Sequence, residues 1–567
     1  MGVSLPGGVG VAKKQRKRGT PAKRGQSRPV DRQPKLEALS VVLAKAPGRD
    51  PAALARTLTR RIGLDGWKIE PVVDDYTEVE IVPPPRGVSI ARAWDLTYAL
   101  RDQPEVTYAS PMFRYLVPEN APVRARRASG RSSGDDPATD TDYEWSLVSA
   151  NVLEAWRLFG AQPPGSGVQV GHPDTGYTLH PELAEPARLL VSQGYDYDDD
   201  DPDPLDDLTD DFLDNPGHGT GTGSVILSGV GSATGGTGPF VSGVAPHAAL
   251  IPIRTTESVV LISMRGLRQA IDHATTHGAQ VISMSLGGPF PGFGTERAVA
   301  RAVDAGTIVL AAAGNEVGFV VFPAAFDQVI AVAASNIRDE PWSGSSHGPA
   351  VDITAPGESV WRARAAREQS GQMAFTVERG NGTSFAVATT AGVAALWVSF
   401  HGWTNLVRRF GASNIARVFK QTLQASCRTP RGWNTAEYGP GIVDARQLLA
   451  APLPATAPAR KFRDARRAAV AVDTTGIETL VHLFPGLPRT RVEELVADLL
   501  HVSDRELPAA VQDLGDELAF HLVMQPQLLE QLRAGSRGAR FAASSRQTAR
   551  RRFSQSKISS RLRRQLR

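Results

Sequence analysis

Four polar residues lie where the apolar pattern would place reactive groups in a parallel sheet. Asp174 follows the apolar segment GVQVGHP, and Asn315 follows TIVLAAAG. His218 stands in the glycine-framed segment PGHGTG, and Ser384 precedes a long apolar run. In an open parallel sheet, groups at the carboxyl ends of the strands gather along one edge. There a carboxylate can orient an imidazole, and the imidazole can take the proton from a serine hydroxyl, which activates that serine as a nucleophile.

Each of these residues also has a simpler interpretation. Ser384 lies in GNGTSFAVATTAGVAALW, and serine commonly caps a helix. Asp174 lies in Asp-Thr-Gly, which suits a turn, while His218 could be structural and Asn315 could be a loop residue. Their joint order favours the catalytic interpretation. A serine at a helix N-terminus offers its backbone N–H to a developing oxyanion, and the Asn315 amide would supply the second donor.

The elements that must position these residues lie between 142 and 451. Apolar strand-like segments alternate there with helical segments such as SMRGLRQAIDHATTHG and ERAVARAVDAG. The alternation predicts an α/β fold with a mostly parallel sheet and helices on both faces. Residues 384–400 are apolar almost all round, so we expect this helix to lie buried at the centre of the domain.

The rest of the chain divides by composition. At 567 residues it is too long for one ordinary domain. Residues 36–117 contain short strand and helix patterns that predict a small α+β domain before the main one. The remaining segments are a disordered basic N-terminus (1–35), a linker (118–141), a second linker (452–472), a small all-α domain (473–533) and a basic tail (534–567).

The cysteine content and the N-terminus bear on location. Cys427 is the single cysteine, so no internal disulfide can form. The basic cluster near the N-terminus follows a weakly apolar stretch, which is the reverse of a secretory signal. No stretch has the length of a membrane-spanning helix. We therefore expect a cytoplasmic rather than a secreted protein, with no membrane span.

Around the four polar residues the sequence resembles the subtilisin-like serine proteases. The order Asp, His, Ser is that of the family, and further matches across 142–451 are GVAP, SMSLGG, DITAPG and GPGIVDARQLLAA. The resemblance implies a serine endopeptidase in which Ser384 attacks the scissile carbonyl and His218 transfers the proton. It also implies that a polypeptide substrate pairs as an added strand with Ser285, Leu286, Gly287 and Gly288, beside a pocket wall that contains Gly314.

Residues 36–117 are similar to the inhibitory propeptide of that family. The resemblance therefore implies a zymogen whose own prodomain is its inhibitor. The linker that follows carries Arg124, Arg126 and Arg127. An exposed basic stretch between two domains is a natural processing point, so we hypothesise that cleavage there accompanies activation.

Three departures from the family pattern leave an alternative open. In GTSFAVATTAG, Ala388 and Thr389 replace the usual Pro and His, and in HGTGTGS, Gly221 and Thr222 replace His and Val. The second change is expected to loosen packing behind the histidine, and the short segment TTESVV to trim the substrate-binding edge. The alternative function is a catalytically silent peptide-binding protein on the same fold. The histidines that match no catalytic role are His172, His180, His247 and His347.

The proposed chemistry requires no redox or organic cofactor and no catalytic metal. The Asp-rich segment 194–214 could bind calcium, because hard cations prefer clustered carboxylates, or could be a solvated acidic loop. Residues 1–35 carry ten Lys and Arg residues, and residues 531–567 carry twelve. These termini could bind nucleic acid or another anionic surface, or could act as disordered solubilising tails.

Overall fold

The structure is a computed structural model that describes the chain in segments. The described residues are 35–44, 50–72, 78–85, 87–114, 142–183, 187–208, 215–231, 238–259, 264–288, 292–316, 319–368, 370–456, 477, 480–481, 483–484, 487–525, 528–529, 531–532, 551–553 and 556–566. The expected disordered N-terminus lies outside this part apart from Lys35. The expected linker 118–141 and most of the linker 452–472 also lie outside it.

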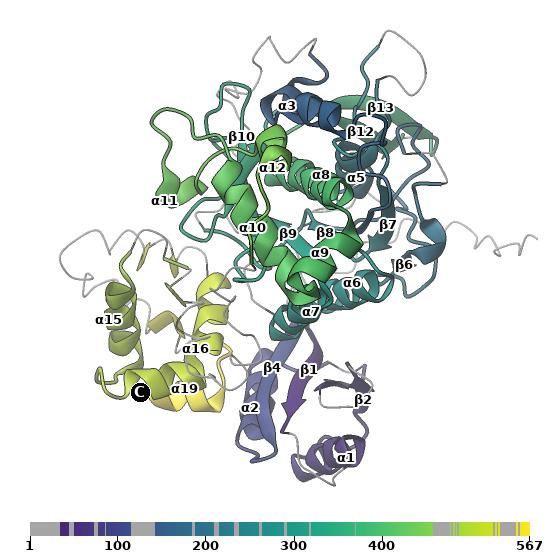
Figure 1. The fold of residues 1–567 in the computed structure, drawn as a ribbon. Helices are drawn as coiled ribbons and strands as arrows, with labels where there is room; N and C mark the ends of the chain where they lie inside the picture. Colours follow the sequence, from purple (N-terminus) through teal and green to yellow (C-terminus); the bar gives the residue numbers. More distant parts are fainter. Residues whose placement is uncertain are drawn as a thin grey trace, which may run out of the picture.

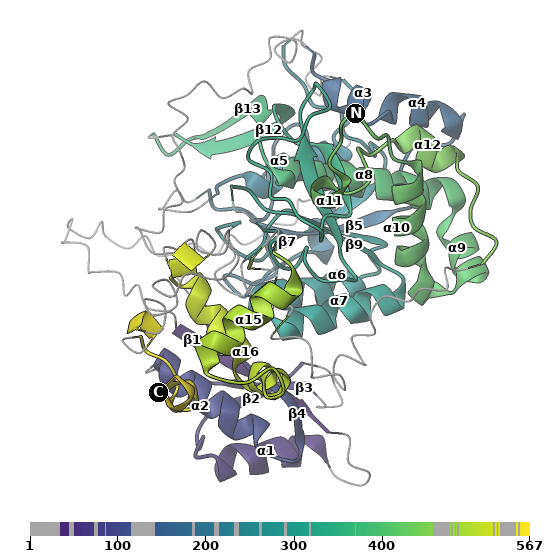
Figure 2. The same cartoon turned by 90° about the vertical axis from the view of Figure 1, so that its left-hand side faces the viewer.

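A seven-stranded sheet forms the centre of the main domain (Figure 1). The strand order is β11-β10-β9-β8-β5-β7-β6, and neighbouring strands pair in parallel. Helices α6 and α7 cover one face, and α5 and α8 cover the other (Figures 1 and 2). The predicted α/β fold is confirmed. The elements are β5 Gln169–Asp174, β6 Tyr195–Asp196, α5 His218–Leu227, β7 Ala249–Arg254, α6 Arg265–Thr276, β8 Val281–Met284, α7 Phe293–Ala305, β9 Ile308–Ala312, β10 Ile330–Ser335, β11 Ile353–Pro356 and α8 Thr383–His401.

Helix α8 is the central core helix. Its residues 383–399 are all buried, because the helix packs against the sheet and, at its side, against α5. Contrary to expectation, one stretch of the described chain is long and apolar enough to cross a membrane, and that stretch is α8. However, 94% of the apolar window lies buried inside the protein, as in the core helix of a folded domain.

Shorter elements complete the main domain. An antiparallel pair, β12 and β13, leads directly into α8 and contacts α5. It therefore forms one wall beside the N-termini of both helices. The bounds are α3 Trp145–Ser149, α4 Val152–Trp156, β12 Val360–Arg367, β13 Met373–Gly380, α9 Trp403–Phe410, α10 Ile415–Ser426, α11 Thr435–Tyr438 and α12 Ala445–Ala450.

The N-terminal domain is a four-stranded antiparallel sheet, of order β2-β3-β1-β4, with two helices. In the strand segment EVEIV, alternate side chains face opposite sides of the sheet. Val79 and Ile81 therefore enter the domain's own core, whereas Glu78 and Glu80 face α6 and α7. The elements are β1 Lys35–Leu43, α1 Pro51–Arg61, β2 Lys68–Pro71, β3 Glu78–Val82, α2 Ile90–Arg101 and β4 Val106–Arg114.

The C-terminal region is helical and extends further than its composition suggested. Its described helices are α15 Arg489–Leu500, α16 Leu507–Val523 and α19 Ser560–Gln565. The expectation that 534–567 forms only a basic tail is wrong for its last part. Phe553, Ile558 and Leu562 are buried in an apolar cluster, so the described segments 551–553 and 556–566 are held by apolar side chains although this part of the chain is basic.

Candidate active site

Asp174 and His218 meet at the carboxyl end of β5. Asp174 is the last residue of β5 and is fully buried, and His218 is the first residue of α5. The sheet order reverses its direction here, because β5 lies between β8 and β7. His218 Nδ1 lies 2.7 Å from Asp174 Oδ1. A Cβ at Gly219 would lie 2.1 Å from the carbonyl oxygen of Gly176, so only glycine lets α5 approach the strand end this closely.

Thr175 and Asp206 hold the two loops that carry this pair. The Thr175 hydroxyl donates to Asp206 Oδ2 at 2.8 Å and accepts the Gly219 N–H at 3.0 Å. The Gly217 N–H donates to the same carboxylate oxygen at 2.8 Å. One buried carboxylate therefore joins the loop after β5 to the turn before α5. The sequence pattern did not single out Asp206, because it lies in an Asp-rich segment away from its partners.

The surroundings of Asp174 keep it charged. Burial alone would raise its pKa, but the His218 ring, His172 and the Thr175 N–H together lower the pKa below its ordinary value. A carboxyl with a lowered pKa loses its charge only when the pH falls through that lowered value. Asp174 is therefore a carboxylate at neutral pH, and it can hold a proton on His218 Nδ1.

Ser384 is the second residue of α8 and does not cap this helix. The N-cap position belongs to Gly382, where no side-chain capping bond forms. The Ser384 hydroxyl donates to the Ser285 carbonyl at 3.2 Å, and the Ser285 hydroxyl donates to the Ser384 carbonyl at 3.0 Å. Within the part of the chain that the structure describes, Ser384 Oγ thus pairs with Ser285 rather than with His218. Bonds between a nucleophile and its base often tighten only when substrate is present.

Asn315 follows β9 and lies beside the N-terminus of α8. Its Oδ1 accepts the Thr383 N–H at 2.9 Å and the Thr383 hydroxyl at 2.8 Å. Because both partners are donors here, Oδ1 must face Thr383, and Nδ2 takes the opposite side of the amide. The Thr383 hydroxyl also accepts the Gly314 N–H at 3.2 Å, which ties the strand end to the helix. The sequence pattern did not reveal this role of Thr383.

His218, Ser384 and Asn315 line one surface cavity of about 330 Å³. The four residues predicted to be catalytic therefore meet in one place, with the carboxylate buried behind the imidazole. Ala388 and Thr389, which depart from the family pattern, are buried within α8 and are not among the lining residues. The other lining residues are Asn215, Pro216, Val259, Arg362, Gly380, Asn381 and Phe385.

The residues predicted to bind the substrate backbone follow β8 in one segment that contains Ser285, Leu286, Gly287 and Gly288. The Gly287 N–H donates to the Val259 carbonyl at 3.0 Å, and Gly288 exchanges two hydrogen bonds of 2.8 Å with Phe322. Val259 belongs to the short segment that was expected to trim this edge, and its carbonyl instead covers part of the edge. An incoming strand that pairs with Gly287 must displace that bond.

Thr222 and His172 form a further contact to Asp174. Among its oxygen acceptors, the Thr222 hydroxyl lies nearest to Asp174 Oδ2, at 3.1 Å, and Thr222 Oγ1 also lies 3.0 Å from His172 Nε2. Burial lowers the pKa of His172 against the effect of Asp174, so the ring is neutral. If the hydroxyl gives its one proton to the carboxylate, His172 must carry its own proton on Nε2. Thr222, which was expected only to loosen packing, thus holds the second carboxylate oxygen.

A double-mutant cycle tests whether Thr222 and His172 act as a pair. Thr222→Val leaves His172 and Asp174 each short of a buried partner, so we expect kcat to fall about 10-fold. His172→Val should cost a similar factor. The double variant should lose no more than Thr222→Val alone, because removing His172 as well takes away the unpaired imidazole and leaves only Asp174 Oδ2 without its partner. Steady-state kinetics on a peptide substrate measure this, and additive losses would show that the two residues act separately.

The described part of the Asp-rich segment surrounds an arginine. The Arg254 guanidinium, 2% exposed, lies 2.6 Å from Asp196, 2.9 Å from Asp199 and 3.7 Å from Asp198. A fixed side-chain cation therefore takes the place that calcium would need among these carboxylates. Among the residues that the structure describes, no group of three His, Cys, Asp or Glu side chains could hold a metal ion. Residues 209–214 lie outside the described part.

Comparison with known proteins agrees with this geometry. The sequence model of the subtilase family matches residues 165–441. Thermitase of Thermoactinomyces vulgaris is 31% identical over 282 residues, which make up 49% of this chain and 88% of thermitase. Subtilisin Savinase of Lederbergia lenta is 31% identical over 300 residues, 51% of this chain and 96% of that protein.

A solved structure extends the likeness in fold. The crystal structure of fervidolysin from Fervidobacterium pennivorans matches with a TM-score of 0.54 at 20% identity, over 75% of this chain and 62% of that one. At this identity the match concerns the fold alone. The fold and the sequence matches make the protein a serine endopeptidase. The chain belongs to the subtilase family.

Proposed function

We propose that the protein cleaves peptide bonds through a triad of Asp174, His218 and Ser384 and an acyl-enzyme intermediate. The observation that carries the proposal is the 2.7 Å contact between His218 Nδ1 and the buried Asp174 carboxylate, with the His218 ring facing the cavity that contains Ser384. This arrangement gives the imidazole a fixed orientation and leaves Nε2 for the serine proton. The chemistry uses only groups that the chain itself supplies.

The first step forms a bond between Ser384 Oγ and the scissile carbonyl carbon. The hydroxyl leaves the Ser285 carbonyl and gives its proton to His218 Nε2, while Asp174 holds Nδ1–H and stabilises the imidazolium. His218 then gives that proton to the leaving amine. Water attacks the ester in the second half-reaction, with His218 again taking the proton and returning it to Ser384.

The oxyanion of each tetrahedral intermediate would lie between Asn315 Nδ2 and the Ser384 N–H. Thr383 fixes the amide through its two bonds to Oδ1, so Nδ2 needs no reorganisation when charge develops. This orientation supports the enzyme over the alternative function, a silent peptide-binding protein. A protein that only binds peptides gains nothing from a donor such as Asn315 Nδ2, because the oxyanion charge that this donor would stabilise develops only during the reaction.

We propose that residues 35–114 act as the inhibitory prodomain. The support is the docking of its sheet on α6 and α7, where Glu78 contacts Arg297 at 2.7 Å and Glu80 contacts Arg268 at 2.8 Å. Both carboxylates are nearly fully buried against arginines, so the two surfaces are matched in charge. The hypothesis that cleavage within 118–141 accompanies activation stays a prediction, and this segment lies outside the described residues.

Covalent labelling by a fluorophosphonate probe tests the triad. The protein freed of its prodomain should react at Ser384, whereas Ser384→Ala and His218→Ala should not. A mass spectrum of the digested protein locates the label. If the folded parent protein stays unlabelled while it still binds peptides, the silent alternative replaces the proposal.

A further inference from the structure

The C-terminal helices share a core with the prodomain rather than with the main core of the catalytic domain. One apolar cluster holds the buried side chains of the prodomain and of the C-terminal helices, together with Phe319 of the catalytic domain, and the main catalytic core is a separate cluster. The Phe520 ring lies 4.9 Å from the Phe113 ring and 6.0 Å from the Trp94 ring, between centroids. Both views place α19, with α16 beside it, next to α2 (Figures 1 and 2).

The fully buried carboxylate of Glu517 forms a hydrogen bond across this junction. Glu517 of α16 accepts the Tyr98 hydroxyl of the prodomain at 2.9 Å. It also accepts the hydroxyl and the N–H of Ser559, both at 2.6 Å. A buried carboxylate is costly unless it is hydrogen-bonded. One of these three donors, the Tyr98 hydroxyl, belongs to the prodomain. The prodomain therefore supplies a hydrogen bond that this buried carboxylate of the C-terminal region needs.

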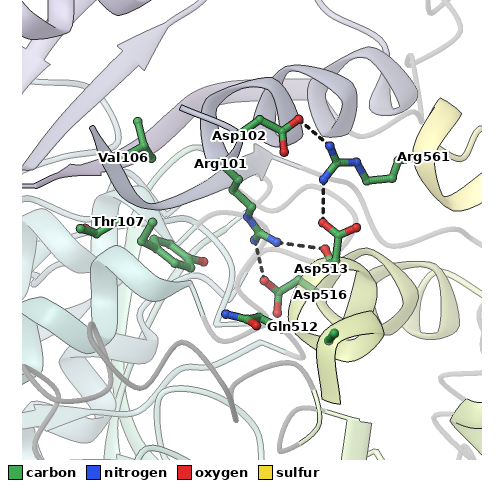
Figure 3. Close-up of a pocket in the computed structure, with 10 residues that line it drawn as sticks. Arg101, Asp102, Val106, Thr107, Gln512, Asp513, Asp516 and Arg561 are labelled. Atoms are coloured by element: carbon green, nitrogen blue, oxygen red, sulfur yellow. Dashed lines mark hydrogen bonds and ion pairs between the residues drawn. The ribbon is translucent and has the colours of Figure 1, made fainter. Parts of the chain in front are cut away.

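Ion pairs surround a cavity of about 380 Å³ at the same junction (Figure 3). Arg101 of the prodomain lies 2.7 Å from Asp516 and donates to the Asp513 carbonyl at 3.2 Å. Arg561 bridges the two parts, since it pairs with Asp102 of the prodomain and lies 2.8 Å from Asp513. Each side thus presents both charges to the other, which selects one orientation of the two parts.

We infer that two of the C-terminal helices, α16 and α19, form a second binding surface for the prodomain and retain it on the enzyme after the linker between prodomain and catalytic domain is cut. This inference rests on the proposed role of residues 35–114 as the prodomain. The cut prodomain contacts two surfaces of one chain, α6–α7 and the C-terminal helices. Both must open before it leaves, and such two-site binding exceeds either single affinity by about 10²–10⁴-fold.

The inference explains the position of the basic C-terminus. Arg561 binds acidic groups of both the prodomain and α16, so this part of the tail serves an internal contact. It also predicts the order of activation. A cut in the linker alone leaves the prodomain in place, and release requires either opening of both contacts or digestion of the prodomain.

A release experiment tests the inference in the full chain. The chain carries Ser384→Ala, to prevent self-digestion, and a recognition sequence for a specific protease inserted within 118–141. After the cut, the dissociation rate of the prodomain is followed by size-exclusion chromatography at timed intervals. Asp513→Arg/Asp516→Arg should release the prodomain at least about 100-fold faster than the parent, because it leaves Arg101 and Arg561 opposite like charges.

The matched control is Glu493→Arg/Glu494→Arg on α15, whose carboxylates pair with Arg489 and Arg491 of the same helix. It makes the same charge change away from the junction and should release the prodomain at the parent rate. A folded Asp513→Arg/Asp516→Arg variant that also keeps the parent rate overturns the inference. If that variant does not fold, the charge swap Arg101→Asp/Asp516→Arg is compared with Arg101→Asp alone. The swap should release the prodomain more slowly than the single variant, because it restores the ion pair in reverse. Equal release rates overturn the inference.

A second measurement separates this inference from the proposed inhibition. The cut protein with Ser384 restored is treated with the fluorophosphonate probe while the prodomain is bound. Full labelling with the prodomain retained means that residues 35–114 do not inhibit, although the C-terminal contact stands. Rapid loss of the prodomain from the parent and the variant alike means that the contact fails, whatever the prodomain does to activity.

Discussion

Replacing His218 with alanine should lower kcat by about 10⁶-fold on a peptide substrate, and replacing Ser384 should cost as much. His218 lies between the buried Asp174 carboxylate and the cavity that contains Ser384, and no other imidazole among the described residues lines that cavity. Without it, the serine proton has no acceptor and the leaving amine has no proton donor. KM should change little, because the imidazole acts mainly in the transition state.

The kcat values of several variants test whether Asp174, His218 and Ser384 act as one catalytic unit or contribute independently. The double variant His218→Ala/Ser384→Ala should be no slower than either single variant, because residues that act as one unit are not additive. Asp174→Asn should cost about 10⁴-fold, since the amide holds the ring in the wrong tautomer. The matched control is the exposed His247→Ala, which should keep the parent kcat. A His218→Ala variant that keeps a hundredth of the activity would contradict the proposal.

The catalytic candidates were accessible to sequence reasoning because each stands at the end of a regular element. Asp174 ends a strand, Asn315 follows one, and His218 and Ser384 begin helices. In a parallel sheet these ends meet at one edge, so the order of apolar segments predicts the meeting point. Glycine supplied the second clue, as at Gly219, where a side chain would collide with a carbonyl oxygen.

Contacts between residues far apart in the chain were not accessible in this way. Asp206 lies in a segment whose composition resembles a solvated acidic loop, and Arg254 pairs with Asp196 of the same segment. Both side chains are nevertheless buried, and Asp206 accepts a hydrogen bond from Thr175. Glu517 and Tyr98 form a hydrogen bond although they are 419 positions apart in the sequence, and a local periodic pattern cannot predict such a contact. Composition alone therefore predicted that 534–567 is a basic tail, although its apolar residues Phe553, Ile558 and Leu562 are buried in a core.

Removing the Asn315 amide should lower kcat about 10²–10³-fold and leave KM almost unchanged. Nδ2 would donate to the oxyanion, which carries its charge only in the tetrahedral intermediates and the transition states that flank them. Its position depends on Thr383, whose N–H and hydroxyl both hold Oδ1. Asn315→Ala therefore tests the donor, and Asn315→Asp should do no better, because a carboxylate repels the oxyanion.

Thr383→Val and Thr383→Ser supply the matched comparison for Asn315. Valine removes the hydroxyl that bonds Asn315 Oδ1 and accepts the Gly314 N–H, so kcat should fall about 10-fold through a loosened amide. Serine keeps the hydroxyl and should restore most of the rate. Steady-state kinetics on one peptide with all three variants give the test. A rise in KM at constant kcat for Asn315→Ala would mean that the amide binds the substrate's ground state, and the second oxyanion donor would then have to be sought among the other groups lining the cavity.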